Sequence, residues 1–173
     1  MQHCKIDKNG KLEITHSSTS SKNDFDFYQG KWSIKNRRLK KRLSNSNDWI
    51  EFSAEQEMNI ILFGLGNTDN FIATFNDQPF EGRTIRLFNP KTRLWSMYWT
   101  DSTNPTLQPP TVGSFENGIG KFYCLDTFEG QDIIVEFLWD KTDPENPIWS
   151  QAFSNDNGVT WETNWYMYMK RKG

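Results

Sequence analysis

Short, turn-forming connectors are the feature of this sequence that most limits how the chain can fold. From Trp32 onward, segments rich in aromatic and β-branched residues alternate with clusters of Gly, Pro, Asn and Asp, and no ten-residue helical period separates them. The connectors are of hairpin size: NPKT (89–92), ENG (116–118), EGQ (129–131) and SNDNG (154–158). Because a parallel crossover needs about a dozen residues, such connectors predict antiparallel neighbours.

A meander of about ten such strands has two edges to protect, and closing the sheet removes both. The sequence therefore predicts an all-β fold, a single antiparallel up-and-down β-barrel of about ten strands. A β-sandwich is the main alternative, whereas the absence of a repeat of fixed period argues against a propeller. With 15% aromatic residues, including eight Trp and thirteen Phe, the core must be built from large flat side chains.

The first part of the chain differs from the rest in composition. Residues 1–23 are polar, and the Asn9-Gly10 pair predicts a small hairpin there. Ser17–Asp24 (SSTSSKND) is typical of a polar linker. We therefore expect an N-terminal extension over 1–23 and one barrel domain over 24–173.

Net charge and cysteine content limit the binding partners and the cellular compartment that can be expected. A net charge of −2 provides no field to recruit nucleic acid or an anionic membrane, so neither partner is expected. Cys4 and Cys124 are predicted to be free thiols. The polar start of the chain lacks the pattern of a signal peptide, and no stretch is apolar enough for a membrane helix, so a cytoplasmic protein is expected.

The segment Ser154–Trp161, SNDNGVTW, matches the Asp-box pattern S-x-D-x-G-x-T-W. In that motif the Asp156 carboxylate and the hydroxyls bond backbone amides, Gly158 takes a positive φ, and Trp161 packs underneath. These tasks are structural, and the motif occurs once here. We predict a hairpin turn and no sugar-cleaving activity.

Gly30-Lys31-Trp32 resembles the G-x-W signature on the first strand of lipocalin-like (calycin) barrels. The resemblance implies that Trp32 closes one end of the barrel, with Lys170 or Arg171 of the last strand across its ring. Over 24–170, the blocks DFDFYQGKW, LFNPKTRLWSMYW, DTFEG and WSQAFSNDNGVTWETNW resemble a family of uncharacterised, mostly bacterial proteins. That likeness implies a lipocalin-like barrel and assigns no activity.

Alternation along the strands suggests a ligand-binding wall. Trp95, Met97 and Trp99 share one face, and a four-residue NPKT connection would place Arg86 opposite Trp95 and Thr84 opposite Met97. If this face points inward, polar groups lie on an apolar wall, as in small-molecule pockets.

The SNDNG turn makes the same prediction for the last hairpin. It would set Phe153 opposite Trp161, Gln151 opposite Thr163, and Trp149 opposite Trp165. The candidate ligand-binding residues are Arg86, Trp95, Met97, Trp99, Gln151, Thr163 and Trp165.

The function favoured by the sequence is non-catalytic binding of a small, largely apolar ligand, either neutral or anionic, inside the barrel. One alternative is a filled barrel, structural or homodimerising, in which Arg86 pairs with Glu136 or Asp101. Another is an isomerase-type or hydrolase-type enzyme using Arg86 or an interior carboxylate, the candidates being Asp101, Asp126, Glu136 and Glu162.

Two further patterns bear on binding chemistry, the histidines and the basic run. Both histidines, His3 and His16, lie in the polar head without ligand spacing, so no metal or cofactor is predicted. The basic run Arg37–Leu43, RRLKKRL, is either an anion contact or a solvated strand end with Leu39 and Leu43 on the barrel. The near-neutral net charge favours the solvated strand end.

Overall fold

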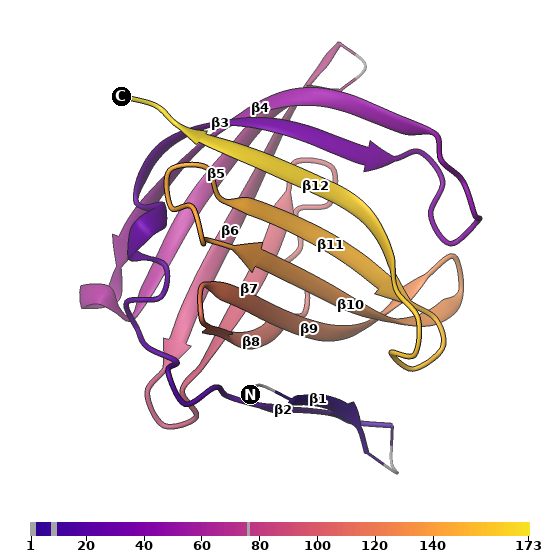
Figure 1. The fold of residues 1–173 in the computed structure, drawn as a ribbon. Helices are drawn as coiled ribbons and strands as arrows, with labels where there is room; N and C mark the ends of the chain where they lie inside the picture. The colour runs from indigo at the N-terminus through magenta and orange to yellow at the C-terminus, as the bar shows by residue number, and fades with distance from the viewer. Residues whose placement is uncertain (1–2, 8–9, 76) are drawn as a thin grey trace.

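The structure is a computed structural model that describes residues 3–7, 10–75 and 77–173. Within these residues ten strands form one closed antiparallel barrel, each strand pairing with the next along the chain and β12 pairing with β3 (Figure 1). The barrel strands are β3 (Gly30–Leu39), β4 (Trp49–Ile61), β5 (Gly66–Phe75), β6 (Gln78–Asn89), β7 (Leu94–Asp101), β8 (Thr111–Glu116), β9 (Ile119–Phe128), β10 (Gln131–Asp140), β11 (Ile148–Ser154) and β12 (Glu162–Arg171). The predicted all-β up-and-down barrel is confirmed.

The N-terminal head forms a separate two-stranded sheet of β1 (His3–Ile6) and β2 (Leu12–Thr15), drawn in indigo beside the barrel in Figure 1. Of the predicted Asn9-Gly10 turn, Asn9 lies outside the described residues, and Gly10 has φ +76°. A positive φ at this position is what a tight hairpin turn asks of glycine.

The segment expected to be a polar linker is instead fastened to the barrel. Ser17 is fully buried, its hydroxyl donates to the Phe115 carbonyl, and its amide donates to Ser114 Oγ over 3.0 Å. Ser20 Oγ donates to the Arg93 carbonyl over 2.6 Å. The serines therefore satisfy backbone groups at a barrel end, a role that composition does not distinguish from that of solvated serines.

One end of the barrel is closed by the chain that enters it. A short 3-10 helix, η1 (Asp26–Tyr28), brings Tyr28 beneath the first barrel strand, and Trp32 Nε1 donates to the Tyr28 carbonyl over 2.8 Å. Trp32 is fully buried, with the Arg171 guanidinium 4.3 Å from its ring centroid. The predicted Trp32 closure is confirmed, with Arg171 rather than Lys170 across the ring.

Gly30 completes this contact. Its φ is +107°, and a Cβ built there would lie 3.6 Å from Arg171 Nη1. Because L side chains rarely adopt such a φ, the glycine of the G-x-W segment is needed for its backbone rather than for its size.

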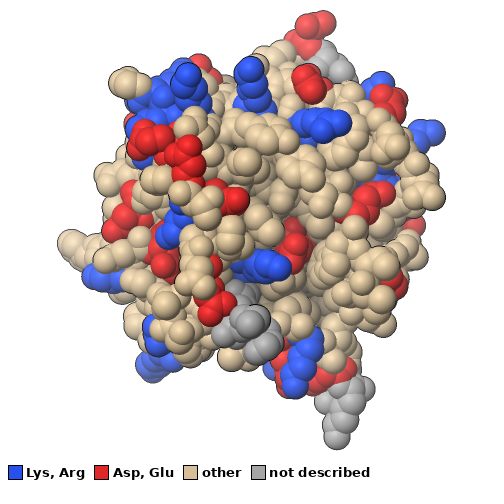
Figure 2. Space-filling view, in the orientation of Figure 1, with Lys and Arg blue, Asp and Glu red and all other residues tan. Residues whose placement is uncertain are grey.

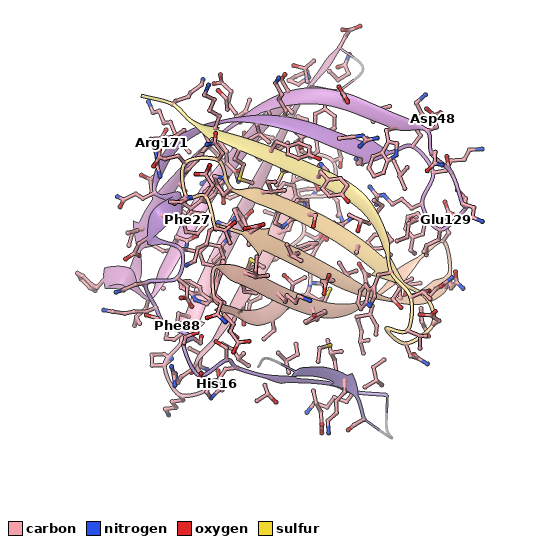
Figure 3. All side chains as sticks on the ribbon, viewed as in Figure 1. His16, Phe27, Asp48, Phe88, Glu129 and Arg171 are labelled. Atoms are coloured by element: carbon pink, nitrogen blue, oxygen red, sulfur yellow. The ribbon has the colours of Figure 1, made fainter. Side chains whose placement is uncertain are left out.

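Burial changes along the barrel axis. Around Trp32 the most deeply buried aromatic side chains gather: Phe25, Tyr28, Phe122 and Trp139. Towards the other end, inward aromatic side chains pack on the same core yet stay partly exposed: Phe52, Phe80, Trp99, Phe137 and Trp165. We call this second end, where β3 ends and β12 begins, the mouth; Figure 3 shows Asp48 and Glu129 there, away from Phe27 and Arg171.

The β6–β7 register differs from the prediction by two residues. Asn89 pairs with Leu94, so the connection is Pro90–Arg93 rather than Asn89–Thr92, with Arg93 at φ +55°. Arg86 consequently lies opposite Met97, and Thr84 lies opposite Trp99. Since side chains alternate with period two, a shift of two residues leaves the predicted face unchanged.

The β11–β12 register is also corrected, and one residue changes face. A β-bulge between Gln151 and Ala152 lets Gln151 pair with Trp165 while Ala152 pairs with Thr163. Thr163 thus lies on the face opposite to that of Gln151, and the prediction that it lines the lumen is wrong. A bulge adds one residue to one strand only, which inverts side-chain parity locally.

Candidate functional site

The candidate site is the part of the lumen on the mouth side. The three predicted ligand-binding residues of β7 lie at different depths along the barrel, and one of them is at the closed end. Trp95 belongs to the closed end, where its ring lies 5.0 Å edge-on from Phe25 and its Nε1 donates to the Ser21 carbonyl. Met97 is buried at mid-barrel. Trp99 lies nearer the mouth, 6.3 Å from the Phe71 ring, and stays partly exposed.

A second aromatic group lines the lumen across β3, β4, β11 and β12. The Trp165 ring lies 5.8 Å from Trp149 and 6.2 Å from Phe52, measured between centroids. Its Nε1 donates to Asn36 Oδ1 over 3.0 Å. Gln151, paired with Trp165 in the ladder, donates to Asn164 Oδ1 over 2.9 Å. Amides and tryptophans therefore share this part of the wall.

Arg86 has an internal partner that the sequence interpretation did not identify. Its guanidinium is ion-paired with Asp69 and donates to Asn67 Oδ1 over 2.9 Å. The predicted partners lie elsewhere: Glu136 accepts from the Tyr123 hydroxyl, and Asp101 accepts from Trp99 Nε1. Pairing of Arg86 with either of those carboxylates is therefore wrong.

The Arg86–Asp69 pair continues into a buried polar chain. Gln56 donates to Asp69, and the Tyr28 hydroxyl donates to Gln56 Oε1 over 2.6 Å. Burial, reinforced by the Asp69 charge, raises the pKa of Tyr28 well above its ordinary value, so the phenol stays protonated. The Arg86 charge is matched within the barrel, which leaves this region electrically neutral.

Several buried polar atoms inside the barrel lack a hydrogen-bond partner among the described residues. They include Asn36 Nδ2 and Thr111 Oγ1, on residues that are 2% and 3% exposed. Asn36 has the inward parity of Trp32 and Ile34, so the alternation along β3 could have revealed it. An unpartnered buried donor is costly, which makes these positions receptive to a ligand oxygen or a water.

Basic side chains gather at the mouth. The Arg38 guanidinium lies 5.1 Å from the Trp165 ring centroid, and that of Arg42 lies 5.5 Å from Phe153 and 5.8 Å from Phe128. A cavity of about 440 Å³ lies here, lined by Arg38, Leu39, Lys40, Lys41, Arg42, Ser44, Phe128 and Glu129. Part of the run interpreted as a solvated strand end therefore borders the lumen.

The Asp-box forms the expected turn beside the mouth. Asp156 accepts from the Val159 and Thr160 amides and from the Thr160 and Ser154 hydroxyls, and Gly158 has φ +85°. These bonds lower the pKa of Asp156 to about 2. Trp161 donates from Nε1 to the Gly158 carbonyl and lies against Tyr123, while remaining 36% exposed. The carboxylate is fully engaged in holding the turn.

Outside the barrel, a depression of about 880 Å³ crosses β12, β3, β4 and β5. Its lining mixes Lys35, Glu55, Ile72, Tyr168 and Lys170. Acidic and basic side chains are likewise interspersed over the face shown in Figure 2. Without a charge of one sign or a converging polar group, this depression does not indicate a particular ligand.

The two cysteine thiols are the remaining candidates for reactive groups. Burial is the largest factor that raises the pKa of Cys124 to about 12 and that of Cys4 to about 11, so neither thiol is activated. Among the residues the structure describes, no group of three or more His, Cys, Asp or Glu is placed to hold a metal ion. Nor does that part of the chain contain a helix long and apolar enough to cross a membrane.

Comparison with known proteins adds no assignment. No protein-family model matches the chain, and no curated protein sequence matches it significantly.

Proposed function

We propose that the protein is a lipocalin-like barrel that binds a small, largely apolar ligand in its lumen without catalysing a reaction. The ligand enters at the mouth, because the other end is filled by η1 and capped by Trp32 and Arg171. A barrel of this strand number is wide enough to hold one small molecule.

The observation that carries the proposal is the contrast in burial along the lumen. Inward aromatic side chains on the mouth side, such as Trp99 and Trp165, are only partly buried, whereas Phe25, Tyr28 and Trp139 at the closed end are almost completely buried. The unpartnered Asn36 Nδ2 and Thr111 Oγ1 add hydrogen-bonding capacity to this apolar wall. Accessible apolar surface with a few polar groups is the usual composition of a small-molecule site.

Small residues at mid-barrel provide a direct test. Ala54 and Ala73 pair across β4 and β5, both inward and buried. Replacing Ala54 with Phe puts a ring into the lumen, whereas Ser53→Phe puts the same ring on the outer face of the same strand. The Ser53 variant is therefore a matched control.

The test is a titration with 1-dodecanol, a neutral apolar probe. Binding is measured by calorimetry and, in a second titration, by tryptophan fluorescence. We expect one probe per wild-type barrel, loss of binding in Ala54→Phe, and retained binding in Ser53→Phe. Circular dichroism checks that both variants fold. Should Ala54→Phe fail to fold, native mass spectrometry of wild-type protein with the probe still measures the stoichiometry. Absence of binding to wild type, or unchanged affinity in a folded Ala54→Phe protein, overturns the proposal.

A further inference from the structure

We propose that Arg38 and Arg42 form an anion-binding site at the mouth, which holds the acidic group of an amphipathic ligand whose apolar part occupies the lumen. This inference rests on the proposed function and narrows the ligand to a class, an apolar chain with a carboxylate or similar oxyanion at one end. Arg86, the cation first expected to meet such a group, is instead matched by Asp69 inside the barrel.

Both guanidiniums are held against the lumen wall by aromatic rings. Arg38 is the inward residue opposite Trp165 in the β3–β12 ladder and lies over its ring. Arg42 lies over Phe153, which packs with the inward residues Ile133 and Val135 at the same end. The cations thus stand where the apolar wall meets solvent, so one molecule can contact both.

The charges around this position are unbalanced. The cavity at the mouth is bordered by four basic residues and a single carboxylate, Glu129. Of the four, Lys40 is ion-paired with Asp48 at 2.9 Å. None of the ion pairs between described residues involves Arg42. The nearby Glu162 charge partly offsets the lowering of the Arg42 pKa by burial, but this carboxylate accepts a hydrogen bond from the Leu43 amide over 2.7 Å. Positive charge therefore exceeds negative charge here.

Holding two guanidiniums together in a partly buried place has a cost. Burial lowers the pKa of Arg38, and burial together with the Arg38 charge lowers the pKa of Arg42. An arginine keeps its proton under physiological conditions, so deprotonation does not relieve the repulsion between the two guanidiniums or their loss of hydration. A bound oxyanion relieves it, since the planar guanidinium fork matches a carboxylate or a phosphate in two parallel hydrogen bonds.

A neighbouring arginine supplies the control. Arg37 follows the outward parity of β3 and lies over Trp49, its Cζ 4.5 Å from the ring centroid. It carries the same charge and the same kind of ring contact, but on the outer surface. Removing Arg37 therefore changes the net charge as removing Arg42 does, without touching the mouth.

The experiment compares dodecanoate with 1-dodecanol, and adds inorganic phosphate alone as the free-anion probe. In low salt we expect wild type to bind dodecanoate about 10-fold or more tightly than dodecanol. In Arg42→Met that preference should fall towards unity while dodecanol affinity is kept, and in Arg37→Met it should persist. Arg42→Lys, which keeps the charge without the fork, should give an intermediate preference and covers failure of the Met variant to fold.

The outcomes separate this inference from the proposed function. Equal binding of acid and alcohol, or a preference that survives Arg42→Met, overturns the anion site and leaves the lumen site standing. If dodecanol does not bind while phosphate binds in an Arg42-dependent way, the lumen proposal fails and the amphipathic ligand with it. Tight acid binding lost in Arg42→Met, with dodecanol affinity kept, supports both.

Discussion

Arg171 and Trp32 face each other across the seam where the last barrel strand meets the first. They are direct partners in the β12–β3 ladder, and the guanidinium carbon lies 4.3 Å from the ring centroid. The same guanidinium donates to the carbonyls of Phe27 and Gln29. One side chain thus ties together the strand that closes the barrel, the helix that fills its end, and the tryptophan beneath.

Replacing Arg171 with Met should lower the free energy of unfolding by about 1–3 kcal/mol, since a cation–π contact and two hydrogen bonds to carbonyls are lost. Urea unfolding at neutral pH measures the change. Lys172→Met is the matched control, because its exposed ion pair with Glu55 should contribute about 0–1 kcal/mol. Equal stability of the two variants would show that the seam does not depend on Arg171.

Arg86→Met should destabilise the protein by about 3–5 kcal/mol, because it leaves the Asp69 carboxylate buried without its cation. Replacing Asp69 with Leu in the same protein should restore much of the loss, since removing both charges avoids the uncompensated one. Chemical unfolding of the two single variants and the double variant forms the cycle. Strictly additive losses would contradict a direct Arg86–Asp69 interaction.

Asp156→Ala should lower the urea midpoint at neutral pH without changing probe affinity in the folded fraction. The pKa of Asp156 is lowered to about 2 by hydrogen bonds, so its contribution is present above the unfolded pKa near 4 and is lost as the pH falls through about 2. The stability difference from wild type should accordingly shrink between these values. Asn155→Ala, in the same turn, is the control and should change little. Loss of probe binding by a folded Asp156→Ala protein would give the turn a functional role.

Gly82→Ala should disturb the lumen, because a Cβ at that position would lie 2.0 Å from Trp99 Cη2. We expect a loss of about 1–3 kcal/mol and a shift in tryptophan emission as the indole is displaced. Adding Trp99→Leu should recover part of the stability by removing the clash. If Gly82→Ala alone has the melting temperature and the fluorescence of wild type, the Trp99 ring does not pack against this glycine.

Side-chain parity is the part of the site that the sequence predicted best. Alternation placed Arg86, Met97 and Trp99 on one face, and the two-residue register error at the NPKT connection left that face intact. Thr163 was misplaced because the bulge beside Ala152 inverts parity, and nothing in WETNW marks which residue is the extra one.

The ion-pair partners of the charged residues could not be predicted from the local sequence pattern. Asp69 lies in GLGNTDN, a stretch rich in turn-forming residues, yet Asp69 belongs to β5 and pairs with Arg86 on β6. Arg38 and Arg42 were likewise part of a basic run that composition alone assigns to solvent.

By itself the sequence determined the antiparallel order of neighbouring strands, because hairpin-sized connectors permit no other neighbours, and the G-x-W segment supplied the glycine and the tryptophan of the closed end. Only the tertiary structure decided which charges are matched and which are not. Pairing depends on which strands the closed barrel brings together and on how deeply it buries them, and neither the distance between two charges nor their loss of water is encoded in the spacing of residues along one strand.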